Sequence, residues 1–195
     1  MLDLSRQYER LRPEILAAIE RVCASQHYIL GEEVSALEHA LAQFTGAAAA
    51  VGCASGTDAL WLALVAAGVG PGDAVITSPF SFFASASAIV RAGATPVFVD
   101  IDPRTFNLDP IHLEKALQSG KSRKLRAILP VHLYGQCADM DAITQLAADA
   151  KISVIEDAAQ AIGATWNGRA AGSLGVAAAF DQPAGGGLDG GEARL

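Results

Sequence analysis

Apolar residues recur at helical spacing near the start of the chain. Over residues 12–25 they share one face of a predicted helix, with Pro13 in its first turn. A second amphipathic helix is predicted over residues 33–44. These two segments predict a helical region that precedes the rest of the fold.

From residue 49 onward, short apolar runs rich in Val and Ile alternate with longer helical patterns. The runs predict strands at residues 49–53, 74–77, 95–100, 126–131 and 152–156. The intervening patterns predict helices at residues 59–67, 83–92, 110–118 and 139–150. This alternation is typical of an α/β domain with a mostly parallel sheet and flanking helices.

Composition and charge restrict the class of protein. The 195 residues are 51% hydrophobic and carry a net charge of -7, which disfavours both a disordered chain and a nucleic-acid partner. No apolar run is long enough for a membrane span, and charged residues occupy the place of a signal peptide. Three well-separated cysteines fit reduced thiols in the cytoplasm better than disulfides or a zinc site.

A glycine follows the first predicted strand at a helix start. In open α/β sheets, ligands bind where strands end and helices begin. Gly56 would let backbone N–H groups approach a ligand, and Thr57 would add a hydroxyl, as in a phosphate cradle. Helix capping by Ser55 or Thr57 explains the same letters equally well.

Three further strand ends carry candidate chemistry. Phe82 belongs to an aromatic cluster that could stack on a flat ring, although aromatic residues are more often core. His132 follows another strand and is more often structural than catalytic when alone. Glu156 and Asp157 end an apolar strand, where an unpaired charge is costly. One of these carboxylates needs a cationic partner, which a ligand could supply.

Two common motifs are absent from the sequence. Gly68, Gly70 and Gly72 follow a helix and precede a strand, the reverse of a dinucleotide-binding loop. No Gly-x-Ser-x-Gly nucleophile elbow is present. A nucleotide-binding dehydrogenase is therefore a poor alternative.

Six segments together resemble the DegT/DnrJ/EryC1/StrS family of pyridoxal-phosphate-dependent sugar aminotransferases. In chain order they are YILGEEVSALEHALAQF, ASGTDALWLAL, SPFSFFASASAI, GATPVFVDIDPRTFNLD, LPVHLYGQCADM and VIEDAAQAIGATWNGRAAGSLG. The resemblance runs to about Phe180 and implies the large domain of a type I aminotransferase fold.

The resemblance also implies roles for five residues around pyridoxal 5'-phosphate (PLP). Gly56 and Thr57 would hold the phosphate, and Phe82 would stack on the pyridine ring. Asp157 would pair with the protonated ring nitrogen, and Gln160 would lie beside the 3-oxygen. The family implies a homodimer that transfers an amino group, commonly from glutamate, to a nucleotide-linked keto-sugar.

The sequence departs from the family pattern after Phe180. The serine that binds phosphate and the lysine that forms the Schiff base are expected at positions held here by Asp181 and Gly186. The last lysine of the chain is Lys151. Without the Schiff-base lysine, no catalytic residue for amino transfer can be assigned.

We expect a partial large domain with an N-terminal helical segment at residues 1–180, and an aperiodic Gly-rich tail at residues 181–195. A reading-frame shift just after Phe180 would explain the abrupt change. Such a chain is expected to be poorly soluble alone and inactive as a transaminase. The alternative is a non-catalytic partner that binds a full-length paralogue and contributes residues to a shared interface.

Overall fold

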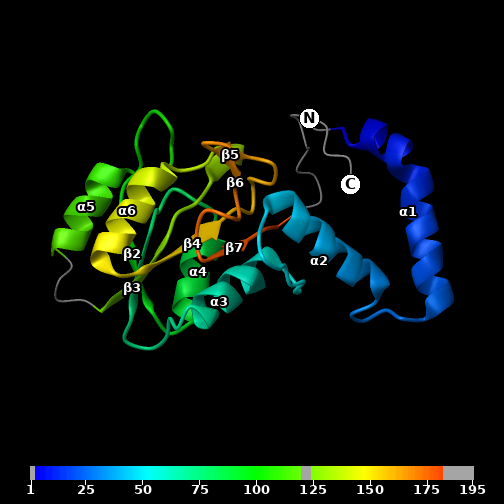
Figure 1. The fold of residues 1–195 in the computed structure, drawn as a ribbon, viewed down its shortest axis with the longest axis horizontal. Coiled ribbons are helices and arrows are strands. Elements are labelled where there is room, and N and C mark those ends of the chain that lie inside the picture. The colour runs from blue at the N-terminus through cyan, green and yellow to red at the C-terminus, as the bar shows by residue number, and fades with distance from the viewer. Residues whose placement is uncertain (1–2, 120–123, 182–195) are drawn as a thin grey trace. The chain divides into compact units, whose positions relative to one another are not determined.

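The computed structural model describes residues 3–119 and 124–181 (Figure 1). These residues divide into two compact units, residues 3–52 and residues 53–181. No helix of the described ranges combines the length and apolar character that crossing a membrane requires.

The first unit consists of helices α1 (Ser5–Ser25) and α2 (Glu32–Thr45). An ion pair of 2.8 Å between Arg21 Nη2 and Glu33 Oε1 links them. The predicted start of α1 was wrong, because the helix begins seven residues before residue 12 and contains Pro13 in its interior. Asp3 accepts a 3.0 Å hydrogen bond from the Ser5 N–H, which satisfies one of the free donors at the earlier start.

The strand predicted at residues 49–53 was also wrong, because this segment has no regular secondary structure. A strand needs a neighbour to satisfy its backbone groups, and none of the sheet strands in the described part of the chain pairs with it. Val51 is 85% exposed, so apolar character alone does not bury the segment. Its Gly52 N–H instead donates a 2.7 Å hydrogen bond to the Glu38 carboxylate.

The second unit is built on a five-stranded sheet with the order β2-β1-β3-β4-β7. Its strands are β1 (Ala74–Thr77), β2 (Thr95–Phe98), β3 (Leu125–Leu129), β4 (Ser153–Asp157) and β7 (Ala177–Ala179). All neighbouring pairs are parallel, which confirms the α/β fold class expected from the sequence. All four residues of β1 and the last three of β3 are buried, which agrees with a sheet that is covered on both faces.

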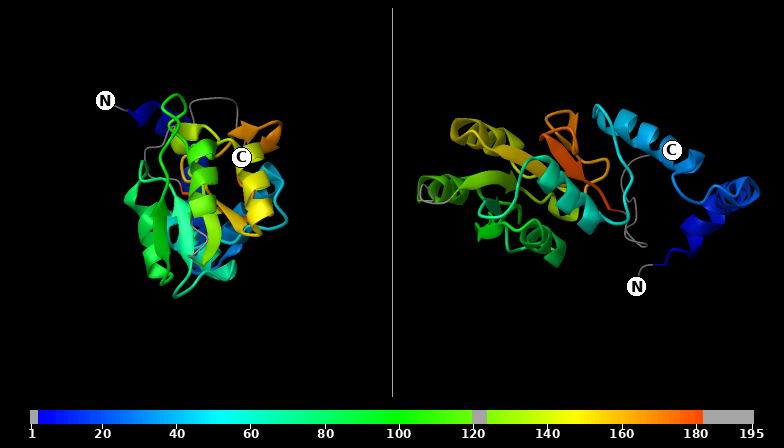
Figure 2. Two further views of the ribbon diagram at one scale, coloured as in Figure 1. Left: turned by 90° about the vertical axis from the view of Figure 1, so that its left-hand side faces the viewer. Right: turned by 90° about the horizontal axis from the view of Figure 1, so that it is seen from below.

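Helices cover both faces of this sheet (Figure 2). Alternate strand residues point to opposite sides, so Val75 and Ile155 pack with α3 (Gly56–Ala66) and α4 (Phe83–Arg91). Ile76 and Ile128 pack with α5 (Pro110–Ser119) and α6 (Met140–Ala150) on the other side. The sheet is therefore packed between two apolar clusters, one on each face.

Short elements complete the unit between β4 and β7. Strands β5 (Thr165–Trp166) and β6 (Arg169–Ala170) form a two-stranded antiparallel hairpin. Asn167 and Gly168 occupy its turn with φ values of 48° and 79°, as two-residue hairpin turns require. The pattern of apolar residues gave no signal for this hairpin, because two-residue strands are shorter than any recognisable period.

Candidate functional site

The candidate site lies where the parallel strands end. Backbone hydrogen bonds of 2.9 Å join the Asp157 N–H to the Pro130 carbonyl and the His132 N–H to the Asp157 carbonyl. Another bond of 2.9 Å joins the Ala158 N–H to the Ala179 carbonyl. The segments that follow β3, β4 and β7 are thus held side by side at one edge of the sheet, where α/β folds bind ligands.

Asp157 is the last residue of β4, and its side chain accepts a hydrogen bond from a hydroxyl group of α4. Ser85 Oγ donates a 2.6 Å hydrogen bond to Asp157 Oδ2 and lies 2.9 Å from Ser81 Oγ. The Asp157 residue is only 4% exposed. A chain of two hydroxyls therefore orients a buried carboxylate.

Burial raises the pKa of Asp157 above its ordinary value, and the nearby Asp181 carboxylate adds to this rise. Hydrogen bonds from Ser85 and from the Ala159 N–H oppose the increase without cancelling it. A cationic group placed beside Asp157 would stabilise its ionised form.

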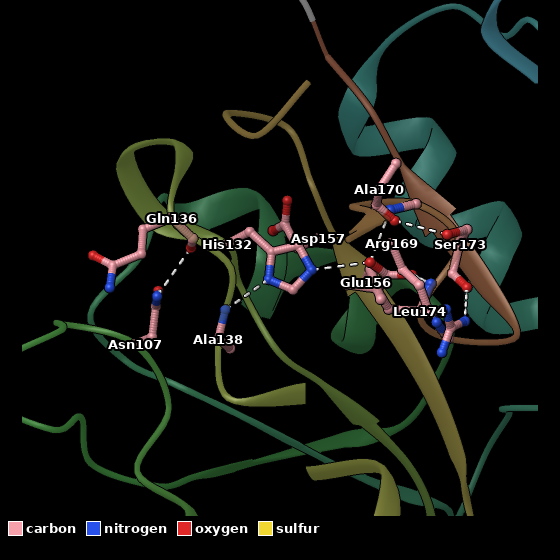
Figure 3. A network of polar contacts seen from close by, with 12 residues as sticks. Asn107, His132, Gln136, Ala138, Glu156, Asp157, Arg169, Ala170, Ser173 and Leu174 are labelled. Atoms are coloured by element: carbon pink, nitrogen blue, oxygen red, sulfur yellow. Dashed lines mark hydrogen bonds and ion pairs between the residues drawn. The ribbon is translucent and has the colours of Figure 1, made fainter. Parts of the chain in front are cut away.

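The neighbouring carboxylate of Glu156 has a complete set of donors (Figure 3). It accepts backbone N–H bonds of 2.7–2.8 Å from Gly172, Leu174 and Gly175, and His132 Nε2 lies 3.0 Å from its Oε2. Burial alone would raise the pKa of Glu156, but these hydrogen bonds lower it below its ordinary value. Glu156 therefore anchors the loop before β7.

His132 has a structural role, which the sequence had favoured for a lone histidine. Its Nδ1 accepts a 3.1 Å hydrogen bond from the Ala138 N–H, so the ring proton lies on Nε2 and points to Glu156 (Figure 3). The residue is completely buried. His132 and the loop amides together satisfy Glu156, so Asp157 is the carboxylate left for a cationic ligand group.

Gly56 and Thr57 are the first two residues of α3, and Ser55 is the N-cap. Ser55 Oγ accepts a 3.1 Å hydrogen bond from the Asp58 N–H. The capping interpretation is therefore confirmed for Ser55. It does not exclude a cradle, because a helix start leaves the N–H groups of its first residues without intrahelical partners.

Asp181 packs directly against Gly56. A Cβ placed on Gly56 would lie 2.5 Å from Asp181 Cβ and 2.8 Å from both its Cγ and its Oδ2. Only a glycine therefore fits beside Asp181 without movement. The contact puts a carboxylate at the start of α3, and Gly186 lies outside the described residues.

Phe82 is the N-cap residue of α4, next to the Ser81 hydroxyl. It is 75% exposed, so its ring is not part of the core. Together with Ser78, Pro79 and Ser81 it lines a shallow pocket beside β1. An exposed ring at this place offers a flat apolar face to a ligand.

Gln160 is tied to the turn that follows β3, a 3₁₀ helix (Leu133–Gly135). Its Oε1 accepts a 3.0 Å hydrogen bond from the Tyr134 N–H. Tyr134 has a φ of 55°, and the buried Asn107 accepts a 3.1 Å bond from the preceding Leu133 N–H. This bond fixes the orientation of the Gln160 amide group through its oxygen, and the amide nitrogen takes no part in it.

The structure connects some of the residues that the sequence singled out. Asp181 contacts Gly56 and lies near Asp157, and Ser85 links Asp157 to Ser81, the residue before Phe82. Ser85 was missed by the sequence analysis. Its spacing of four residues from Ser81, which lies just before α4, is the signal that could have revealed it.

Comparisons with known proteins show which family the chain resembles. The model of the DegT/DnrJ/EryC1/StrS aminotransferase family matches residues 9–181. A "pleiotropic regulatory protein" of Geobacillus stearothermophilus is 55% identical over 92% of this chain and 47% of its own length. A UDP-2-acetamido-2-deoxy-3-oxo-D-glucuronate aminotransferase of Pseudomonas aeruginosa is 51% identical over 86% of this chain and 46% of its own length.

Solved structures show the same fold. An aminotransferase of this family from Brucella abortus superposes with a TM-score of 0.89 at 38% identity, covering 92% of this chain and 49% of that chain. Similar solved structures include forms with bound pyridoxamine phosphate (PMP) or PLP. The chain spans about half the length of these relatives. On the strength of the family match over residues 9–181, the chain belongs to the DegT/DnrJ/EryC1/StrS aminotransferase family.

Proposed function

We propose that this chain carries the ring-binding half of a PLP site from a sugar-nucleotide aminotransferase, and that it does not catalyse amino transfer alone. The observation that supports this most directly is Asp157. It is a buried carboxylate that has a hydroxyl and an amide as partners, while Glu156 beside it is fully satisfied. A protonated pyridine nitrogen is the cation that such a carboxylate would stabilise.

The residues present fit the ring of the cofactor. In this proposal Asp157 receives the ring N–H, and the exposed Phe82 stacks on the ring face. Gln160 would lie beside the 3-oxygen, with its amide oriented by the Tyr134 N–H. When bound, the cofactor supplies an electron sink for a carbanion, and the protonated ring nitrogen strengthens that property.

The residues at the phosphate end fit less well. Gly56 and Thr57 offer N–H groups at the start of α3, as a phosphate site requires. The Asp181 side chain, however, packs on Gly56 where the family pattern expects a serine. We therefore propose that the chain holds the ring more strongly than the phosphate.

A transaminase also needs an amine that can form a Schiff base and move a proton. The chain has four lysines, and the last of them is Lys151, so none stands after the segment that contains Asp157. Gly186 stands at the expected lysine position. The chain is thus proposed to bind the cofactor without a covalent bond and to lack transaminase activity by itself. Detection of amino transfer from glutamate to a nucleotide-linked keto-sugar would refute this.

Several broader properties follow from the family and are part of the proposal. The parent activity would use a nucleotide-linked keto-sugar and an amino donor such as glutamate, in a cytoplasmic homodimer. The Pseudomonas aeruginosa relative supports the sugar-nucleotide class by its name. Free thiols at Cys23, Cys53 and Cys137 support a reducing compartment.

The binding proposal is tested with PMP, whose amine cannot condense with lysine side chains. Wild type, D157N and D149N are titrated and followed by the fluorescence of PMP. D149N removes an exposed carboxylate from α6 and serves as the matched control. We expect D157N to weaken binding by about tenfold or more, as loss of a buried ion pair does, and D149N to leave it unchanged. Equal affinities in all chains would refute the proposal.

A second candidate is a non-catalytic partner of a full-length paralogue. The absence of a lysine after residue 151 favours it, because a subunit without this residue can still contribute binding groups. Mixing the chain with such a paralogue distinguishes the two. A stable complex with altered transaminase rates supports the partner role, and no association excludes it.

The reading-frame hypothesis concerns residues 182–195, which lie outside the described residues. Resequencing of the coding DNA across codons 175–195 tests it. A second frame that encodes the missing serine and lysine supports a frameshift. Its absence would make Asp181 and Gly186 native features and favour the partner role.

A further inference from the structure

We propose that Asp181 excludes phosphate from the start of α3 and thereby selects against the phosphorylated form of the cofactor. The inference builds on the proposed function, which places the cofactor phosphate at Gly56 and Thr57. It goes beyond that function by assigning a specificity-determining role to a residue that departs from the family pattern.

The first observation is steric. Asp181 follows β7, and its Cβ, Cγ and Oδ2 lie so close to Gly56 that an added methyl group would be 2.5–2.8 Å from each. The side chain therefore covers the face of Gly56 on which a phosphate would have to sit. A phosphate can approach this face only if the Asp181 side chain moves away.

The second observation is electrostatic. A helix start attracts an anion because its free N–H groups carry partial positive charge. The Asp181 side chain, which carries a carboxylate, lies against Gly56 at this helix start. An incoming phosphate would thus meet a carboxylate of like charge rather than an open cradle.

The third observation concerns hydrogen-bonding capacity. A serine at position 181 could donate its hydroxyl proton to a phosphate oxygen, whereas an ionised aspartate has only acceptors. The substitution therefore removes a donor and adds a charge at the same place. The ring contacts assigned above involve Asp157, Phe82 and Gln160, so Asp181 acts on ring binding through its charge near Asp157.

The test compares PMP with pyridoxamine, which has the same ring and no phosphate. Wild type, D181S, D181N and D149S are titrated with both ligands. For wild type we expect similar affinities for PMP and pyridoxamine, because the phosphate group of PMP makes no favourable contact. D181S is expected to bind PMP about tenfold more tightly, as removal of one close like charge predicts, and this gain should exceed any change in pyridoxamine affinity, which reports the effect of Asp181 on Asp157. D149S controls for net charge and should alter neither affinity.

Inorganic phosphate provides a readout that does not depend on the ring. Its binding is followed by the backbone amide shifts of Gly56 and Thr57. A stronger response in D181S and D181N than in wild type supports the inference, even if no chain binds pyridoxamine and the proposed function fails. If wild type prefers PMP by tenfold and D181S changes neither PMP nor phosphate binding, the inference is overturned while the cofactor site stands.

Discussion

Ser85 Oγ donates a 2.6 Å hydrogen bond to Asp157 Oδ2 and so joins the first turn of α4 to the end of β4. Both residues are buried, at 1% and 4% exposure. A neutral hydroxyl reduces the cost of the buried charge but does not neutralise it. The carboxylate is thereby held ready for a cationic partner, at the expense of the stability of the chain without that partner.

The substitution D157N is expected to stabilise the chain at pH 7. Because burial raises the pKa of Asp157 in the folded state, the unfolded chain loses this proton at a lower pH than the folded chain. The contribution of protonated Asp157 to the free energy of unfolding is therefore present at low pH. It is lost as pH rises from the ordinary aspartate pKa through the raised pKa of the folded state. Asparagine has no charge to bury and keeps an oxygen for Ser85.

Urea unfolding of wild type and D157N between pH 3 and pH 8 measures this difference. The gain from D157N should grow as pH rises through the titration of Asp157. A gain that is constant with pH would show that the Asp157 carboxylate is not destabilised in the fold.

The substitution S85A is expected to cost about 1.5–3 kcal/mol of unfolding free energy, because it removes a hydrogen bond to a buried charged group. In the D157N background the cost should fall to about 1 kcal/mol, since the remaining bond is between neutral groups. S87A is the matched control, because Ser87 Oγ donates a 3.2 Å bond to the local Ala84 carbonyl. Equal costs of S85A in both backgrounds would contradict the coupling.

The substitution E156Q is expected to destabilise the fold by about 3 kcal/mol, because an amide nitrogen cannot accept the backbone N–H bonds of the loop. The lowered pKa of Glu156 gives stability that is fully present above the ordinary glutamate value and is lost as pH falls through the lowered pKa. E114Q, on the exposed face of α5, is the control. Chemical denaturation that gives E156Q and E114Q the same midpoint would contradict this role.

The contact between Gly56 and Asp181 predicts that G56A changes the free energy of unfolding in opposite directions with and without Asp181. With Asp181 present, G56A should destabilise the chain, because the new Cβ meets the Asp181 side chain. In the D181G background the same change should stabilise it by up to about 1 kcal/mol, as alanine does within a helix. Thermal unfolding of the four chains gives the coupling, and additive effects would show that the two residues do not touch.

Much of the fold could be predicted because its signals are local. The runs at β1 and β3 are mostly apolar, and their alternation with amphipathic helices predicts a parallel sheet. The segment at residues 49–53 shows the limit of this approach. It has the composition of a strand, but strand formation depends on a neighbour, and pairing is not encoded in the segment itself.

The candidate site was predicted in part. Asp157 and Gly56 were found because strand ends and helix starts have recognisable positions. The sequence could not predict which of Glu156 and Asp157 is structural and which is left for a ligand. The difference depends on backbone amides of residues 172–175, which hydrogen-bond to Glu156. The same holds for Asp181, whose contact with Gly56 joins two residues far apart in the sequence.

The central claim is that Asp157 binds the protonated nitrogen of a pyridoxal-type ring. The most direct measurement is the ¹⁵N chemical shift of ring-labelled pyridoxamine bound to wild type and to D157N, at a pH above the pKa of the ring nitrogen in free pyridoxamine. We expect a pyridinium shift in the wild-type complex and its loss in D157N. A neutral pyridine shift in the wild-type complex would contradict it.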